Sequence, residues 1–104
     1  HLEATPGTID EIALQHYVEA AAYIKSRGIV PIITLHHFVE PLWFTQMGGF
    51  EKTKNIDYFF RFCRQVYDAL CEHVDVIVTF NEPAVPPTMG LVLGDFPPNR
   101  IGRF

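Results

Sequence analysis

The chain has 104 residues, of which 48% are hydrophobic, 13% aromatic and 19% charged, a composition far from that of disordered proteins. Its formal net charge is −4 and it contains no basic run, which argues against a nucleic-acid partner. The longest unbroken apolar run, residues 20–24, is much shorter than the roughly 20 residues of a membrane span. We therefore expect a packed domain, or part of one, that has neither nucleic acid nor a membrane as its partner.

The sequence gives only weak indications of the cellular location of the protein and of the redox state of its cysteines. The first residues show no secretory signal, and because the chain begins at His1 rather than Met the location stays open, with the cytoplasm as the default expectation. Cys63 and Cys71 lie eight residues apart in a helical pattern, about 12 Å along its axis. A disulfide needs Cα atoms within about 7 Å, so we interpret both as unpaired core thiols.

The first predicted element is a helix over residues 9–27. Thr8 and Glu11 have the spacing of a capping box, apolar residues then recur at helical intervals, and a glycine provides the stop. A strand is predicted over residues 29–35, which are almost all apolar and mostly β-branched. Proline removes a donor from the strand ladder, so we place Pro31 near the start of the strand.

A second helix and a second strand follow. The helical pattern from about Asn55 puts its apolar side chains on one face: Ile56, Phe59, Phe60, Cys63, Val66, Tyr67 and Leu70. The segment from Val74 to Phe80 is predicted to be a buried strand, and the proline-rich residues 83–104 are predicted to be mostly loop. The order helix, strand, helix, strand predicts parallel strands and an α/β fold for residues 1–104.

Four polar residues stand at the C-terminal ends of the predicted strands: His36, His37, Asn81 and Glu82. Barrels and doubly wound sheets build their sites at this edge, and the long connection over residues 36–54 starts there. A carboxylate at the end of a buried strand is partly desolvated, which favours its protonated form and makes Glu82 a candidate general acid. The alternative is that Asn81 and Glu82 form a solvated turn that simply ends the strand.

The two adjacent histidines allow a metal site with Glu40 or Glu82, or a hydrogen-bonding or core role for one of them. Adjacent strand residues point to opposite faces, so only one histidine can face the site if the strand continues through them. The loop aromatics Phe38, Trp43, Phe44 and Phe50 either stack on a sugar or plug a helix–strand interface. No nucleotide-binding or serine-hydrolase motif is present.

Together these segments resemble family 1 of the glycoside hydrolases, the β-glucosidase family of (β/α)8 barrels. The resemblance includes Leu2-Glu3 with Gly7, Gly28-Ile29 through Thr34-Leu35-His36-His37-Phe38, Pro41-Leu42-Trp43, Gly48-Gly49-Phe50, and Thr79-Phe80-Asn81-Glu82-Pro83. The last segment is similar to the motif at the end of the family's strand four, and it is the most specific. Phe38, Ala84 and Leu91 depart from the commoner family pattern.

The resemblance implies roles for three residues. Glu82 matches the catalytic acid/base, Asn81 the residue that binds the sugar's 2-hydroxyl, and His37 a histidine that hydrogen-bonds the glycone. The family's nucleophile lies in a Thr-Glu-Asn-Gly segment at strand seven, and the sequence contains no such segment.

We therefore expect a partial (β/α)8 barrel, around strands three and four, because a closed barrel takes about 250 residues. The expected function is that of a retaining β-glycosidase fragment that carries the acid/base half of the site, acts on a β-glycoside or oligosaccharide and uses no cofactor. One alternative is a noncatalytic truncated or sugar-binding remnant. Another is a metal-dependent barrel hydrolase that uses His36, His37 and Glu82.

Overall fold

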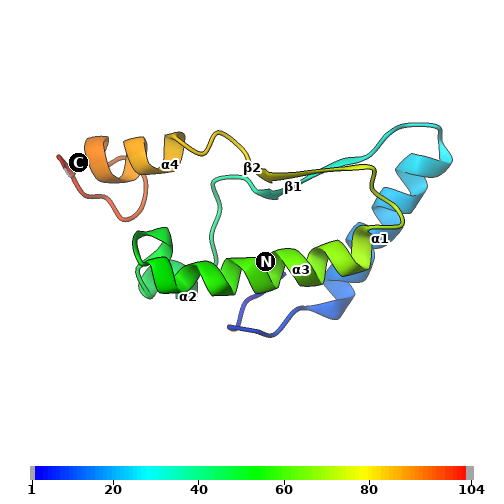
Figure 1. Ribbon diagram of the computed structural model, residues 1–104, viewed down its shortest axis with the longest axis horizontal. Helices are drawn as coiled ribbons and strands as arrows, with labels where there is room; N and C mark the ends of the chain where they lie inside the picture. Colours follow the sequence, from blue (N-terminus) through cyan, green and yellow to red (C-terminus); the bar gives the residue numbers. More distant parts are fainter. Residues whose placement is uncertain (1, 103–104) are drawn as a thin grey trace.

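The computed structural model describes residues 2–102 and contains two strands with helices around them (Figure 1). The regular elements, in chain order, are α1 (Glu11–Ser26), β1 (Ile32–His36), α2 (Leu42–Gln46), α3 (Ile56–Leu70), β2 (Val76–Phe80) and α4 (Val85–Pro87). The 3₁₀ turns η1 (Gly49–Glu51) and η2 (Thr53–Asn55) precede α3, and a π-helical segment, η3 (Thr88–Leu93), follows α4. The predicted order helix, strand, helix, strand is confirmed.

Helix α1 begins two residues later than predicted, and its cap is a different residue. The N-cap is Asp10, whose side chain accepts a hydrogen bond from the backbone N–H of Ala13 at 3.0 Å. An aspartate here satisfies one of the free N–H groups of the first turn. The capping box predicted from Thr8 and Glu11 is therefore wrong, because Thr8 belongs to a preceding turn that pairs with Thr5.

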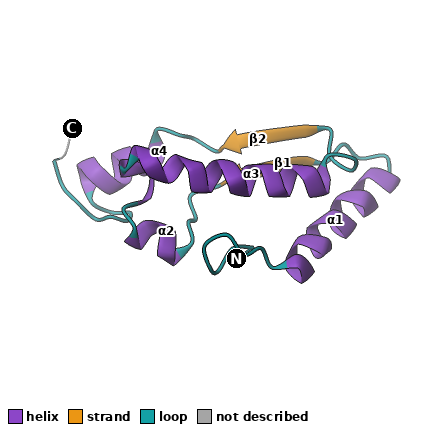
Figure 2. Ribbon diagram, turned by 60° about the horizontal axis from the view of Figure 1, so that its bottom comes forward, coloured by secondary structure: helices purple, strands orange, loops and turns teal. Residues whose placement is uncertain are grey.

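Strands β1 and β2 form a two-stranded parallel sheet in which Ile32 pairs with Val76 and His36 with Phe80. Pro31 is buried just before β1, so the ladder does not need its missing N–H group. Helices α1 and α3 lie on one side of this sheet, and Figures 1 and 2 show no element of the described chain on the other side. Ile32 and Val76 are 61% and 45% exposed.

The core lies between the sheet and the two long helices. Its buried members come from the start of the chain, both helices and the segment between α3 and β2: Ile9, Leu14, Ala21, Val66, Leu70 and Val74. Ile33, Leu35 and Ile77 of the strands pack against this cluster. The apolar face predicted for α3 is only partly covered, because Phe60 and Tyr67 are 69% and 54% exposed.

Two segments expected to be loop are partly helical. Residues 42–46 form α2, and residues 85–93 form α4 and η3 despite their prolines. Proline has no N–H group to lose in the first turn of a helix, which is where the prolines of α4 stand. Within the described part of the chain, no helix is both long and apolar enough to cross a bilayer.

Candidate active site

The two histidines at the end of β1 have opposite environments. His36 is 5% exposed and lies against the rings of Phe50, Phe59 and Phe80, with ring centroids 5.6, 6.1 and 4.9 Å away. His37 is exposed, with its ring 5.0 Å from that of Phe38. His36 therefore packs toward the neighbouring strand, and only His37 is accessible to a ligand at this edge.

Asn81 and Glu82 directly follow β2 and lie beside the histidines. The backbone N–H of Asn81 donates to the carbonyl oxygen of His36 at 2.9 Å, which continues the strand pairing beyond Phe80. Because β1 and β2 are parallel, this bond brings the two C-terminal ends to one edge of the sheet. The structure thus places the imidazole of His37, the carboxamide of Asn81 and the carboxyl of Glu82 on adjacent strand ends.

Both strand ends contain a residue with an unusual backbone conformation. Phe38 has φ 65° and Glu82 has φ 44°, in the left-handed region that glycine normally occupies. Such a conformation costs a residue with a Cβ atom about 1–2 kcal/mol, and strained residues cluster at functional sites. The carbonyl of Glu82 accepts from the N–H of Val85 at 2.9 Å, which fixes the turn into α4.

The desolvation predicted for Glu82 is not provided by this chain. Its side chain is exposed, because the backbone turns out of the sheet at Glu82 itself. The sequence argument assumed that strand burial continues through the residue after β2, and this was wrong. Any apolar cover over the carboxyl group must come from outside the described residues.

His36 carries unmet hydrogen-bonding groups. Neither ring nitrogen has a hydrogen-bond partner within the described chain, and the nearest carboxylate oxygen, Glu40 Oε1, is 3.6 Å from Nε2. A buried polar group without a partner costs about 1–3 kcal/mol. The surrounding aromatic rings explain why the side chain is buried, but they provide no hydrogen-bond partner for its ring nitrogens.

The loop aromatics mostly serve packing. Phe44 is buried, and Phe50 contacts the rings of His36, Phe44, Phe59 and Phe80. These two rings plug the space between the sheet and α3. Phe38 instead lies beside His37 and 6.2 Å from the ring of Phe96, so it stays close to the accessible edge.

Comparison with known proteins identifies the family. The sequence profile of glycosyl hydrolase family 1 matches residues 3–103. The chain belongs to glycosyl hydrolase family 1. Its structure is similar to that of the β-glycosidase from Pyrococcus horikoshii, with a TM-score of 0.92 and 36% identity over 97% of this chain and 24% of that one.

Two similar proteins are much longer than this chain. It is 34% identical over 102 residues to the chloroplastic galactolipid galactosyltransferase of Arabidopsis thaliana, covering 95% of this chain and 16% of that protein. It is 33% identical over 93 residues to the 6-phospho-β-galactosidase of Clostridium acetobutylicum, covering 89% of this chain and 20% of that protein. The chain is thus a partial (β/α)8 barrel, as predicted.

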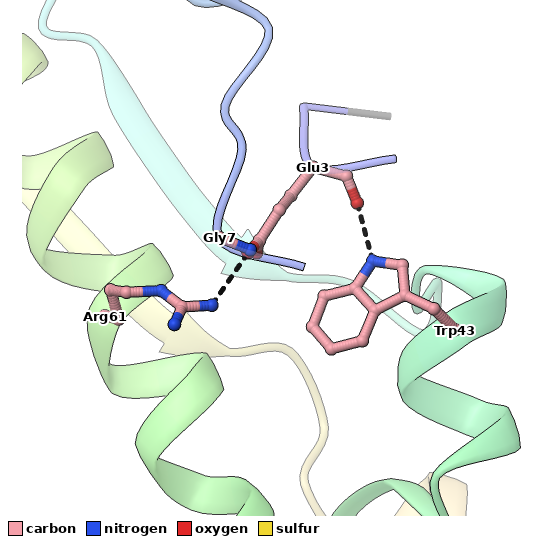
Figure 3. Close-up of polar contacts among 4 residues, drawn as sticks. All are labelled: Glu3, Gly7, Trp43 and Arg61. Atoms are coloured by element: carbon pink, nitrogen blue, oxygen red, sulfur yellow. Dashed lines mark hydrogen bonds and ion pairs between the residues drawn. The ribbon is translucent and has the colours of Figure 1, made fainter. Parts of the chain in front are cut away.

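One buried polar cluster of this family 1 chain was not found from the sequence (Figure 3). Glu3 is 3% exposed, and its carboxylate accepts hydrogen bonds from the backbone N–H of Gly7 and from Arg61 of α3 at 3.1 Å. Its backbone carbonyl accepts from the indole N–H of Trp43 at 2.9 Å. The cluster ties the first residues of the chain to α2 and α3. Two of the three partners, Trp43 and Arg61, lie 40 and 58 residues from Glu3, so local spacing carries no signal of those contacts.

The structure also gives the positions of the two cysteines and of the residues that could bind a metal. Cys63 is half-buried, and burial raises the pKa of its thiol to about 11. Cys71 is exposed just after α3, so its interpretation as a core thiol was wrong. Within residues 2–102, no three His, Cys, Asp or Glu side chains come together as a possible metal site.

Proposed function

We propose that this chain contributes the acid/base half of the active site of a retaining β-glycosidase. The observation that carries the proposal is the hydrogen bond from Asn81 to the carbonyl of His36. In a family 1 chain, this bond brings His37, Asn81 and Glu82 to one edge of a parallel sheet, where barrel enzymes hold their substrates. A complete barrel that contains this segment, called here the complete barrel, would supply the rest of the site.

In the proposed mechanism, Glu82 first acts as an acid. Retaining glycosidases use two carboxyl groups about 5–5.5 Å apart, one as nucleophile and one as acid/base. The nucleophile attacks the anomeric carbon while Glu82 gives its proton to the departing oxygen. The negative charge of the nucleophile favours the protonated form of Glu82 during this step.

Glu82 then acts as a base. Once the nucleophile is glycosylated its charge is gone, so the ionised form of Glu82 becomes favourable. The carboxylate takes a proton from the attacking water, and the sugar is released with its original configuration. Asn81 would hold the 2-hydroxyl of the sugar, and His37 would hold another hydroxyl of the glycone.

A transfer reaction is the second candidate function. It is favoured by the 34% identity to a protein named as a galactosyltransferase. Glu82 would activate the hydroxyl group of an acceptor in the same way that it activates water. Product analysis of the complete barrel, with and without an added alcohol, separates the two reactions.

Glu82→Ala in the complete barrel tests the proposal. The variant should slow cleavage of a methyl β-glycoside far more than that of the dinitrophenyl β-glycoside of the same sugar, because the dinitrophenolate leaves without protonation. Added azide should restore turnover of the activated substrate and yield the β-glycosyl azide, since azide needs no general base.

The matched control is Glu72→Ala, which removes an exposed carboxylate near the start of β2. It should leave both rates and the response to azide as they are in the unmodified barrel. If Glu82→Ala slowed both substrates equally and azide had no effect, Glu82 would be a structural residue and the proposal would be wrong.

A further inference from the structure

One face of α1 is exposed along the length of the helix. Ile12 is 86% exposed and Tyr23 is 67% exposed, and the exposed residues His16 and Glu19 lie between them. At 3.6 residues per turn, these four residues lie about 140–200° around the helix axis from Leu14, which is buried in the core. The four residues, called here the outer stripe, therefore point away from the core. Figure 2 shows α1 at one end of the described chain, with no other element beyond it.

The outer stripe also stays accessible in the complete barrel. Barrel helices form an outer ring, in which each helix packs one face on the strands and its sides against the neighbouring helices. The face opposite the core then points to solvent. The elements that complete the barrel belong on the open side of the sheet and beside the helices, so a partner for the outer stripe must be a separate molecule.

The outer stripe is matched to a reversed copy of itself. Its members are separated by four, three and four residues, which is the spacing of side chains along the contact between two paired helices. Reversal of the stripe about its midpoint exchanges Ile12 with Tyr23 and His16 with Glu19. In an antiparallel pair, an aliphatic side chain therefore meets an aromatic ring and an imidazole meets a carboxylate, and each contact occurs twice.

We propose that the outer stripe binds a second copy of this chain, as an antiparallel helix pair around a two-fold axis. In the pair, the imidazole of His16 donates an N–H hydrogen bond to the Glu19 carboxylate of the second copy. Oε1 of Glu19 accepts from Gln15 of its own helix at 3.2 Å, so the other carboxylate oxygen receives the imidazole. Ile12 packs against the ring of Tyr23 at each end of the contact, which removes the two large apolar side chains of the stripe from water.

Other partners fit the outer stripe less well. A parallel pair would place the Glu19 carboxylates of the two copies against each other, and like charges in contact oppose association. A membrane surface would meet a carboxylate, and the stripe contains no Lys or Arg to bind anionic lipids. An unrelated protein has no reason to repeat the order of the stripe in reverse, whereas a second copy does so by symmetry. The proposal does not depend on the catalytic role of Glu82.

The concentration dependence of the mass of the complete barrel tests for the dimer. The dimer should be weak, because one helix from each copy forms the whole contact, and sedimentation equilibrium between about 1 and 200 µM should show monomer and dimer in reversible equilibrium. Ile12→Asp changes two contacts of the dimer at once, so it should raise the dissociation constant at least tenfold. Arg64→Asp, at an exposed residue of α3, is the matched control and should leave the constant unchanged.

An exchange of charges tests the antiparallel register. His16→Glu places a carboxylate opposite Glu19 of the second copy, so it should also raise the dissociation constant at least tenfold. The double variant His16→Glu/Glu19→His returns one imidazole and one carboxylate to each contact, and it should bring the constant to within about threefold of its original value. This rescue requires that position 16 of one copy meets position 19 of the other.

Three results would contradict the proposal. A complete barrel that stays monomeric up to about 200 µM would show that a second copy is not the partner of the outer stripe. A dimer that forms equally well in Ile12→Asp and His16→Glu would use another surface. A double variant that dimerises no better than His16→Glu would overturn the antiparallel register. Thermal midpoints check that every variant is folded, which the exposure of all the substituted residues leads us to expect.

Discussion

At the scale of single residues, neighbours in the sequence have different environments because each strand ends at a sharp change of backbone direction. His36 is held among three phenylalanine rings, whereas His37 is exposed immediately before Phe38, with its left-handed φ of 65°. Asn81 is similarly paired to β1 through its backbone, while the following Glu82 turns outward. Of the four polar residues at the ends of the two strands, only His36 is therefore buried. The other three, His37, Asn81 and Glu82, lie at the edge of the sheet.

The two histidines should respond differently to truncation in the complete barrel. His37→Ala should lower kcat/KM by a factor equivalent to about 1.5–3 kcal/mol, if the lost glycone hydrogen bond is charge-assisted. His36→Ala should act mainly on stability, because it leaves a hole among the rings of Phe50, Phe59 and Phe80. Steady-state kinetics and thermal midpoints of both variants check this. A catalytic defect confined to His36→Ala would overturn the assignment of His37 to the sugar.

The two cysteines should differ in reactivity because only the thiolate reacts. Burial raises the pKa of Cys63 to about 11, so roughly one thiol in a thousand is ionised there at pH 8. Iodoacetamide at that pH should modify the exposed Cys71 first, and the rate at Cys63 should keep rising until the pH passes about 11. Mass spectrometry of timed samples measures both rates, with Cys71→Ser to isolate the slower thiol. Faster labelling of Cys63 at pH 8 would contradict the burial.

At the scale of elements, sequence periodicity located both long helices and both strands to within a few residues, because each has a clear apolar pattern. The prediction starts the first strand at Ile29, but β1 starts at Ile32. The residues before Ile32, including the buried Pro31, are apolar like the strand but are not paired with β2. Helices α2 and α4 were not predicted, because they are short and lie in segments whose prolines and glycines suggested loop. The polar residues after the two strands predicted that His37, Asn81 and Glu82 come to one edge of the sheet, but the exposure of Glu82 depends on a backbone turn that no local pattern shows.

The contacts around Glu3 should contribute measurably to the stability of the protein, because they connect the first residues of the chain to α2 and α3. Arg61→Met removes the cation that faces a carboxylate only 3% exposed, and it should destabilise the complete barrel by about 1–3 kcal/mol. Arg64→Met, on the same helix, breaks an exposed 3.9 Å pair with Asp68 and should cost at most about 0.5 kcal/mol. Urea unfolding midpoints of the two variants provide the comparison. Equal midpoints would mean that Glu3 keeps its position without Arg61.

At the scale of the whole molecule, the chain has more apolar surface than its own elements cover. Ile32, Val76 and Val78 of the sheet and Ile56, Phe60 and Tyr67 of α3 are all at least 38% exposed. In the Pyrococcus horikoshii β-glycosidase, the matching segment makes up 24% of the chain, and further strands and helices complete the fold. A two-stranded sheet with open edges is marginal by itself, so we expect the purified 104-residue chain to aggregate readily.

The same incompleteness predicts that the 104-residue chain alone hydrolyses no aryl β-glycoside. General acid catalysis contributes about 10²- to 10⁴-fold, which cannot replace a nucleophile and an enclosed pocket that together form and break the glycosyl intermediate. Glu82 is also exposed here, so this chain provides no enclosed surroundings for its carboxyl group. The measurement is release of nitrophenol from activated β-glycosides by the refolded chain, beside the complete barrel as positive control. Turnover by the chain that disappears in Glu82→Gln would contradict this prediction, because it would mean that these residues alone suffice for catalysis.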